Sequence, residues 1–306
     1  MVVSSEPAVV PCPIPTDKPA PDGFPDYLPP WRPQAESWWI LTAAPLPWQT
    51  KALPKGALDN HESIRLQDFQ ATYEGGPGAI QLIRYHESPV GPYDELIYVP
   101  GQMSYKSGDS SVSGRSITRI YVSSFAPLTN GRRIWNTPKH LARFEFIREA
   151  PSDPLSPTLV SVYPSLSDSP TPEFSPDPCS EPVGTFTLLA QNPLQPIQLS
   201  ACVTRYRVLQ PPLSEPMGTE KWITVEVENE GYIKIMYPEP GLIGGRYGDG
   251  IGCPDIEPMS IGLWCPKASV HLFTHIGTPL TQNLVGPSLS SPEILDLISH
   301  EPKKIK

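Results

Sequence analysis

The sequence has few cysteines, and none of them is paired in a metal-binding or redox spacing. The five cysteines are an odd number, lie far apart and include no Cys-x-x-Cys motif. A disulfide framework is therefore disfavoured, and free thiols in a cytoplasmic protein are expected. No catalytic triad, metal-ligand cluster or phosphate-binding loop stands out either, so we predict no metal and no bound cofactor.

Long apolar runs and clusters of positive charge are also missing. No stretch approaches the roughly 20 apolar residues that a membrane-spanning helix needs. Residues 1–22 lack the charged and apolar regions of a signal peptide, which again favours a cytoplasmic protein. The formal net charge is −9 and there is no basic stripe, so neither a membrane nor a nucleic acid is expected as a partner.

Proline is abundant, with 42 in 306 residues. Residues 1–36 are predicted to form a Pro-rich N-terminal arm, extended or disordered. Residues 150–183 are predicted to be a Pro/Ser-rich insertion within a single domain that spans residues 37–306. One all-β domain of this length is common.

Short alternating segments between turn residues predict a mainly β fold. Glu230-Gly231 is interpreted as a tight hairpin turn between two strands. One helix near the C-terminus is predicted to begin at Ser291, where Ser-Pro-Glu precedes an apolar face. The strands are expected at residues 38–43, 79–85, 93–99, 117–123, 140–146, 159–163, 185–190, 196–202, 205–209, 222–228, 232–237, 259–265 and 268–274.

The most informative stretch runs from Asn130 to Phe146. Asn130-Gly131 indicates a turn. Thr137-Pro138 indicates a second turn, or a helix start with an N-cap threonine and a first-position proline.

Lys139 follows this turn directly and precedes an alternating segment in which Ala142, Phe144 and Phe146 share one face. Imine chemistry needs a neutral amine, and an apolar interior disfavours the charged form of a lysine. Lys139 is therefore the candidate nucleophile. The same position also suits an ordinary strand-end lysine whose ammonium group reaches water.

Glu95 is the second candidate. Strand alternation places it on the face of Ile97 and Val99, and a carboxylate among aliphatic side chains needs a partner. Two interpretations remain open, an acid/base or a structural salt bridge, for example with Arg119 or Arg132.

The segment around Lys139 resembles the catalytic-lysine segment of the acetoacetate decarboxylase family. That family carries Gly-Arg-Glu, a short spacer, and then an aromatic residue followed by Pro-Lys-Lys-Leu. The matching residues here are Gly131-Arg132-Arg133 and Thr137-Pro138-Lys139-His140-Leu141, and Tyr93-Asp94-Glu95 is similar to the family's Tyr-x-Glu motif. The resemblance covers residues 78–148. This segment is most similar to the fungal branch of the superfamily, and that similarity implies a role in secondary metabolism.

The resemblance implies a cone-shaped antiparallel β-barrel with few helices and an interior cavity. It implies a lyase in which Lys139 forms an imine with a β-keto acid or related carbonyl compound, most simply for decarboxylation. Glu95 would orient substrate or move protons, and His140 would tune Lys139 or relay protons. A homo-oligomer is also implied. The predicted substrate-binding residues are Arg132, Arg119, Tyr121, Tyr93 and Gln81.

Departures from the family pattern leave other functions open. His140 replaces the second lysine, Gln81 replaces a cavity glutamate, and no early-strand arginine lies between Trp38 and Trp48. The imine would then serve an aldol, dehydration or cyclisation step on a polyketide-like substrate. Two further hypotheses are a non-catalytic barrel that binds an apolar small molecule, and an interaction protein that acts through its Pro-rich segments.

Overall fold

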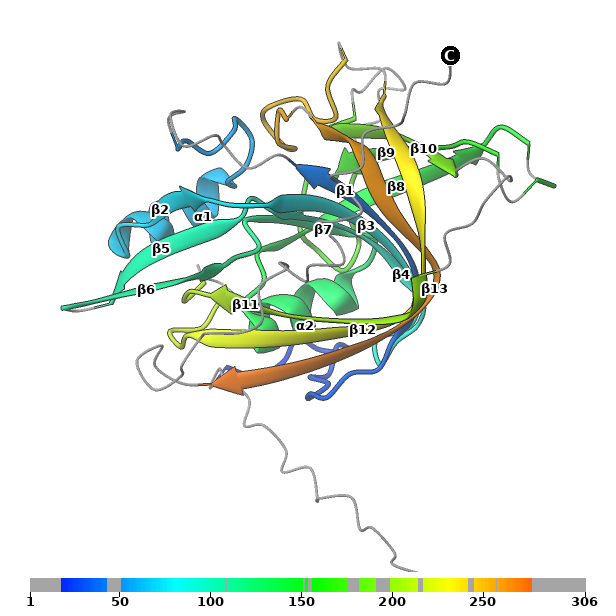
Figure 1. Cartoon of the computed structure of the whole chain (residues 1–306). Coiled ribbons are helices and arrows are strands. Elements are labelled where there is room, and N and C mark those ends of the chain that lie inside the picture. The colour runs from blue at the N-terminus through cyan, green and yellow to red at the C-terminus, as the bar shows by residue number, and fades with distance from the viewer. Residues whose placement is uncertain are drawn as a thin grey trace, which may run out of the picture.

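The computed structural model describes residues 18–42, 51–107, 109–150, 152–153, 156–174, 182–190, 199–213, 217–241, 245–256 and 258–276. Over these ranges the chain is mainly β with two helices, which confirms the predicted class (Figure 1). The helix predicted at Ser291 lies outside the described residues. The helices are α1 (Asn60–Asp68) and α2 (Phe125–Trp135). The strands are β1 (Gln34–Thr42), β2 (Thr72–Gly75), β3 (Gly78–Glu87), β4 (Tyr93–Val99), β5 (Gln102–Ser107), β6 (Ser110–Arg115), β7 (Arg119–Val122), β8 (Lys139–Arg148), β9 (Thr158–Pro164), β10 (Gly184–Ala190), β11 (Leu199–Gln210), β12 (Ile223–Pro240) and β13 (Pro258–Ile276).

The strands form a 10-stranded sheet in the order β10-β9-β8-β7-β4-β3-β1-β13-β12-β11, and a 3-stranded sheet in the order β2-β5-β6. β10 also pairs with the last part of β12, from Met236 to Pro240. The series of pairings therefore returns to its first strand. In Figure 1 the long strands β12 and β13 bend strongly and contribute to both sides of the molecule.

The pairing of β7 with β8 is parallel, unlike the antiparallel sheet that was expected. Parallel neighbours need a crossover connection, and α2 provides it. The turn predicted at Asn130-Gly131 is wrong, because both residues lie inside this helix. Leu128 and Ile134 are almost fully buried, so the packing of an apolar helix face outweighs the local turn signal.

Asn136 ends α2 in the left-handed conformation with φ of 49°. Asparagine tolerates this conformation better than most residues. Its Nδ2 donates to the carbonyl oxygens of Pro211 and Lys221, at 3.0 and 2.6 Å. The helix start predicted at Thr137-Pro138 is wrong, because these residues lead directly from the cap into β8.

The hairpin predicted at Glu230-Gly231 is also wrong, because β12 runs through this position as one strand with a register shift beside it. A Cβ on Gly231 would lie 2.5 Å from the carbonyl oxygen of Lys267. The glycine thus permits a close approach of β13 rather than a chain reversal. The predicted strand pairs 196–202 with 205–209 and 259–265 with 268–274 merge in the same way into β11 and β13.

Part of the predicted N-terminal arm packs on α2. Arg133 Nε donates to Asp26 Oδ1 at 2.7 Å, and the ring of Phe24 meets that of Phe125 edge-on at 4.8 Å. Trp31 forms a β-bridge with Leu272 of β13. Residues 18–33 therefore cover the helix instead of extending away from the domain.

Apolar side chains fill both faces of the large sheet. Along β4, Ile97 and Val99 join one buried cluster, whereas Leu96 and Tyr98 join a second one on the opposite face. The first cluster surrounds the cavity described below.

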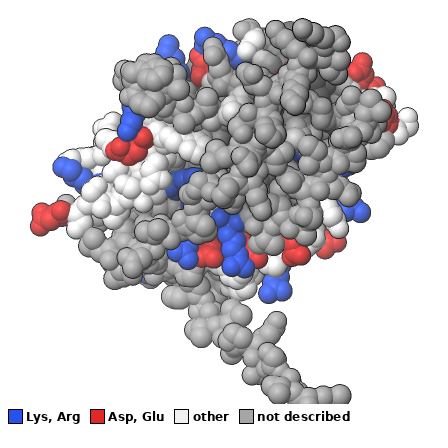
Figure 2. Space-filling model, in the orientation of Figure 1, with Lys and Arg blue, Asp and Glu red and all other residues white. Residues whose placement is uncertain are grey.

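The surface carries charges of both signs. On the face shown in Figure 2, the described acidic and basic residues are interspersed. Exposed pairs such as Arg207 with Glu226, 3.0 Å apart, follow this pattern. Neither α1 nor α2, the helices of the described part of the chain, has the length and apolar character needed to cross a membrane.

Candidate active site

A cavity of about 70 Å³ lies inside the first apolar cluster. This volume has room for roughly five water molecules. Its wall is mostly aliphatic and aromatic and is built from strands that lie far apart in the sequence. The polar residues other than tyrosine and tryptophan in the described wall are Ser37, Gln81, Glu95, Thr137, Lys139 and Asn229.

Lys139 begins β8 and points into this cavity. The strand register places Lys139 opposite Ile120 of β7, which in turn lies opposite Ile97 of β4. Glu95 is two residues from Ile97 and therefore on the same face. The two side chains meet across β7, with Lys139 Nζ 2.6 Å from Glu95 Oε1 and side-chain exposures of 8% and 4%.

Three buried polar atoms of the wall lack an aligned hydrogen-bond partner among the described residues. They are Glu95 Oε1, Trp135 Nε1 and Thr137 Oγ1. For Glu95 the contact with Lys139 has the distance of an ion pair but not the alignment of a hydrogen bond. Buried polar groups are normally satisfied, so Trp135 Nε1 and Thr137 Oγ1 stand out as unused hydrogen-bonding groups of the wall.

The tyrosines beside Glu95 remain neutral. Tyr85 and Tyr93 stack with ring centroids 4.5 Å apart. Burial and the charge of Glu95 raise the pKa of both phenols well above the ordinary value. Burial likewise raises the pKa of Tyr206 to about 12, against hydrogen bonds with Gln81 and Asn229. The wall therefore offers phenol groups as neutral hydrogen-bonding groups at physiological pH.

Gly131 makes room for the lysine side chain. A Cβ at this position would lie 2.3 Å from Lys139 Cδ and 2.6 Å from Lys139 Cε. The Lys139 side chain thus passes directly over a helix backbone that has no side chain at this point.

We predict that Gly131→Ala displaces the amine of Lys139. Covalent labelling of the amine by a carbonyl compound should fall about tenfold or more, and overpacking should reduce the free energy of unfolding by ~1–3 kcal/mol. Mass spectrometry and urea denaturation would measure the two effects. Thr129→Ala in the same helix is the control. Unchanged labelling in Gly131→Ala would show that the close packing does not position the amine.

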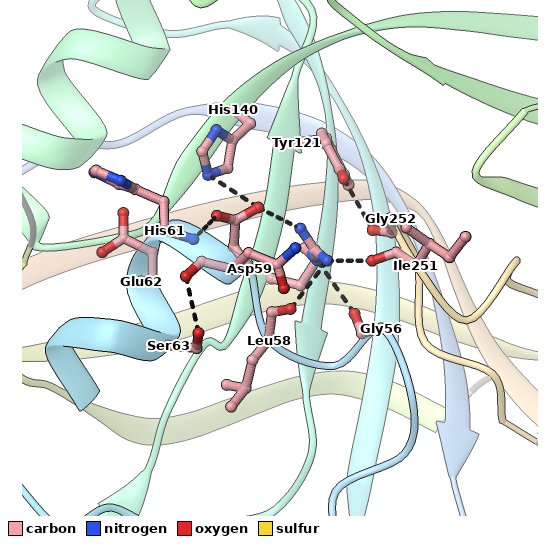
Figure 3. A network of polar contacts seen from close by, with 12 residues as sticks. Gly56, Leu58, Asp59, His61, Glu62, Ser63, Tyr121, His140, Ile251 and Gly252 are labelled. Carbon is pink, nitrogen blue, oxygen red and sulfur yellow. Dashed lines mark hydrogen bonds and ion pairs between the residues drawn. The ribbon is translucent and has the colours of Figure 1, made fainter. Parts of the chain in front are cut away.

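His140 lies on the opposite face of β8 from Lys139. Its Nδ1 is 2.7 Å from Asp168 Oδ2, and its Nε2 is 3.8 Å from Asp59 Oδ2 (Figure 3). Burial alone would raise the pKa of both aspartates, but interactions with His140 make the largest contribution to lowering each below the ordinary value. The structure therefore separates His140 from the cavity by the strand itself.

These lowered pKa values predict acid sensitivity. The unfolded chain binds protons at the ordinary aspartate pKa and the folded chain only at lower pH. The contribution of Asp59 and Asp168 to the free energy of unfolding is thus complete above about pH 4. It is lost as the pH falls through the pKa values of these aspartates in the folded chain. Urea denaturation should show a smaller loss of stability between pH 6 and pH 3 in Asp168→Asn than in the unchanged chain. An equal loss in both would contradict this.

Arg119 and Tyr121 belong to the same outer cluster. Arg119 Nη1 lies 2.7 Å from Asp59 Oδ2, and the guanidinium also donates to three main-chain carbonyls (Figure 3). The hydroxyl group of Tyr121 donates a hydrogen bond to a fourth main-chain carbonyl at 2.9 Å. Both side chains therefore join loops to β7 outside the cavity wall. The carbonyls belong to Gly56, Leu58, Ile251 and Gly252.

Arg132 is buried against Glu62, with Nη2 2.6 Å from Oε1. Its Nη1 donates to the main-chain oxygen of Lys139 at 3.4 Å. The salt bridges suggested between Glu95 and either Arg119 or Arg132 are not formed, because each arginine has another carboxylate and Glu95 faces Lys139.

The cavity brings together Lys139, Glu95, Tyr93 and Gln81 from the predicted site residues. His140, Arg132, Arg119 and Tyr121 do not line it. Sequence reasoning missed Trp135, Thr137 and Tyr206. Thr137 and Trp135 had a usable signal, since they lie within four residues of Lys139, whereas nothing local connects Tyr206 with it.

The fold and site together define a mainly β protein with a buried lysine–carboxylate pair. No family model and no curated protein matches the sequence. Two solved structures have a similar backbone path. One, from structural studies of acetoacetate decarboxylase, has 10% identity, a TM-score of 0.43, and coverage of 83% of this chain and 91% of the other. The acetoacetate decarboxylase of Legionella pneumophila has 13% identity, a TM-score of 0.44, and coverage of 86% and 94%.

Proposed function

We propose that the protein is an imine-forming enzyme, a carbon–carbon lyase in which Lys139 attacks the carbonyl group of a small molecule. The observation that supports this most directly is the buried amine 2.6 Å from Glu95 in an apolar cavity. In this mechanism the closed series of strand pairings acts as a barrel, which keeps bulk water away from the amine. No cofactor is required for this chemistry, and a cytoplasmic location and a homo-oligomer stay predictions from the sequence.

The first step uses the two side chains together. A separated charge in an apolar interior is costly, so transfer of the lysine proton to Glu95 leaves two neutral groups and removes that cost. The neutral amine then forms a bond to the carbonyl carbon. The nitrogen passes one of its protons to the former carbonyl oxygen, Glu95 returns a second, and the oxygen leaves as water to yield an iminium ion. Tyr93, whose ring centre is 5.3 Å from Nζ, stabilises this cation.

The iminium ion then accepts the electrons of a neighbouring bond. If that bond joins a carboxylate, CO2 leaves and an enamine remains; this is the decarboxylation that the family resemblance implies. If the bond joins a carbinol carbon, a second carbonyl compound leaves instead. In the first case the enamine carbon takes its proton from water, and in the second it takes the hydroxyl proton that Glu95 removed from the carbinol. Water then restores the amine and releases the product.

Reductive trapping tests the proposal. The intact chain is incubated with acetone and cyanoborohydride, and its peptides are analysed by mass spectrometry. We expect an isopropyl adduct at Lys139 far in excess of that at the exposed Lys51. Labelling at Lys139 no faster than at Lys51 would contradict an activated amine.

A further inference from the structure

The charges of the cavity wall restrict the ligand. Lys139 and Glu95 are the only charged side chains among the described residues that line the cavity. They have opposite signs and lie 2.6 Å apart, so their charges offset each other. A carboxylate on the ligand would be a second buried anion beside Glu95 without a second cation, an arrangement that costs free energy.

The nearby arginines do not change this balance. Arg119, Arg132 and Arg133 are each bound to a carboxylate outside the cavity. Arg115 is half-buried and its charge reaches the hydroxyl of Tyr206, but it is not among the described lining residues. The wall thus offers no guanidinium to a ligand carboxylate among the described residues.

Two neutral donors are available in its place. Trp135 is 4% exposed and Thr137 is 5% exposed, and Trp135 Nε1 and Thr137 Oγ1 have no described partner. An indole N–H only donates, and a hydroxyl donates or accepts. Both residues lie between the end of α2 and Lys139 at the start of β8, and both line the same cavity as the amine.

We propose that the cavity binds an uncharged carbonyl compound with a second oxygen, which Trp135 and Thr137 hold, and that the reaction is aldol cleavage or formation. This rests on the proposed imine function and selects among its reactions. The cavity volume of about 70 Å³, room for roughly five water molecules, favours a small ligand.

In the cleavage direction the substrate is a β-hydroxy ketone bound to Lys139 as its iminium ion. Glu95 takes the proton of the β-hydroxyl group, and that oxygen forms a carbonyl as the adjacent carbon–carbon bond breaks. The electrons of the broken bond form the enamine. Glu95 returns its proton to the enamine carbon, and water releases the ketone and the amine. The oxygen of the departing carbonyl is the one that Thr137 and Trp135 hold.

A pair of probes that differ in charge but not in size tests the inference. Acetoacetamide and acetoacetate are trapped separately on the intact chain with cyanoborohydride at pH 7. Adduct formation at Lys139 is divided by the rate of each probe with a free lysine peptide. We expect acetoacetamide to label Lys139 about tenfold or more faster than acetoacetate. Thr137→Val should slow labelling by the amide several-fold, and Thr137→Ser should retain it.

Other results would overturn the inference in distinguishable ways. If acetoacetate labels Lys139 as fast as the amide, the imine function stands and the uncharged ligand is wrong. Loss of that labelling in Arg115→Gln would place the carboxylate at Arg115. Equal loss in both Thr137 variants would remove the hydroxyl from ligand binding. If neither probe labels Lys139 in the folded chain, the imine function fails and the inference fails with it.

Discussion

Lys139→Met is expected to abolish imine chemistry while retaining the fold. Acetone is a suitable reporter, because an iminium ion in equilibrium with its enamine exchanges the methyl protons of acetone with D2O. Without the amine no covalent intermediate forms, and the exchange rate, followed by proton NMR, should fall by ~10³-fold or more, as for a lost nucleophile. Exchange within about tenfold of the unchanged chain would place the chemistry elsewhere.

A double variant separates this chemical effect from an effect on folding. Lys139→Met leaves Glu95 buried without its cation, and breaking a buried pair in this way costs ~3–5 kcal/mol. Replacing both residues, as Lys139→Met with Glu95→Gln, removes the unpaired charge. We expect the double variant to recover most of the lost stability in urea denaturation and none of the exchange activity. Recovery of activity with stability would show that Lys139 is structural.

Glu95→Gln is expected to slow both imine formation and proton exchange while keeping Lys139 in place. The amide keeps the size of the side chain but cannot accept or return a proton. Loss of a positioned acid or base costs ~10²–10⁴-fold in rate. Exchange of acetone protons should fall by this amount, and cyanoborohydride should trap the adduct on Lys139 more slowly, because Glu95 also moves the proton in the imine-forming step.

Glu36→Gln is the matched control for Glu95→Gln. Glu36 is a partly buried carboxylate of β1 that accepts a hydrogen bond from Trp264 Nε1 at 2.9 Å and does not line the cavity. Its loss should leave exchange unchanged. If Glu36→Gln and Glu95→Gln slow exchange equally, the effect is one of stability and not of proton transfer.

The parts of the site that the sequence predicts are those set by strand alternation. Alternation places Glu95 with Ile97 and Val99, and the structure has this arrangement. It also sets Ala142, Phe144 and Phe146 together on one face of β8, as found. The place of Lys139 at the start of that strand left its burial open, and its packing over Gly131 and against Glu95 decides it. Its catalytic role stays a prediction.

Other features depend on contacts between distant segments and have no local signal. Asn130-Gly131 has the dipeptide of a turn, yet the helix forms because its apolar side chains pack into the core. The same Gly131 is needed for the passage of the Lys139 side chain, which only three-dimensional packing reveals. Arg119 was equally ambiguous, since an arginine in a β-branched strand is either inward and paired or exposed at the surface. Asp59, 60 residues away, pairs with it.

The closure of the sheet has a consequence for the newly made chain. Val225 and Val227 of β12 and Val270 of β13 form part of the cavity wall, although they follow Lys139 by more than 80 positions. Until these last strands dock, the amine is an ordinary hydrated lysine. On the proposed imine function, reactivity toward aldehydes and ketones arises only at the end of folding. Incomplete chains then escape modification by metabolites, and adduct formation reports that assembly is finished.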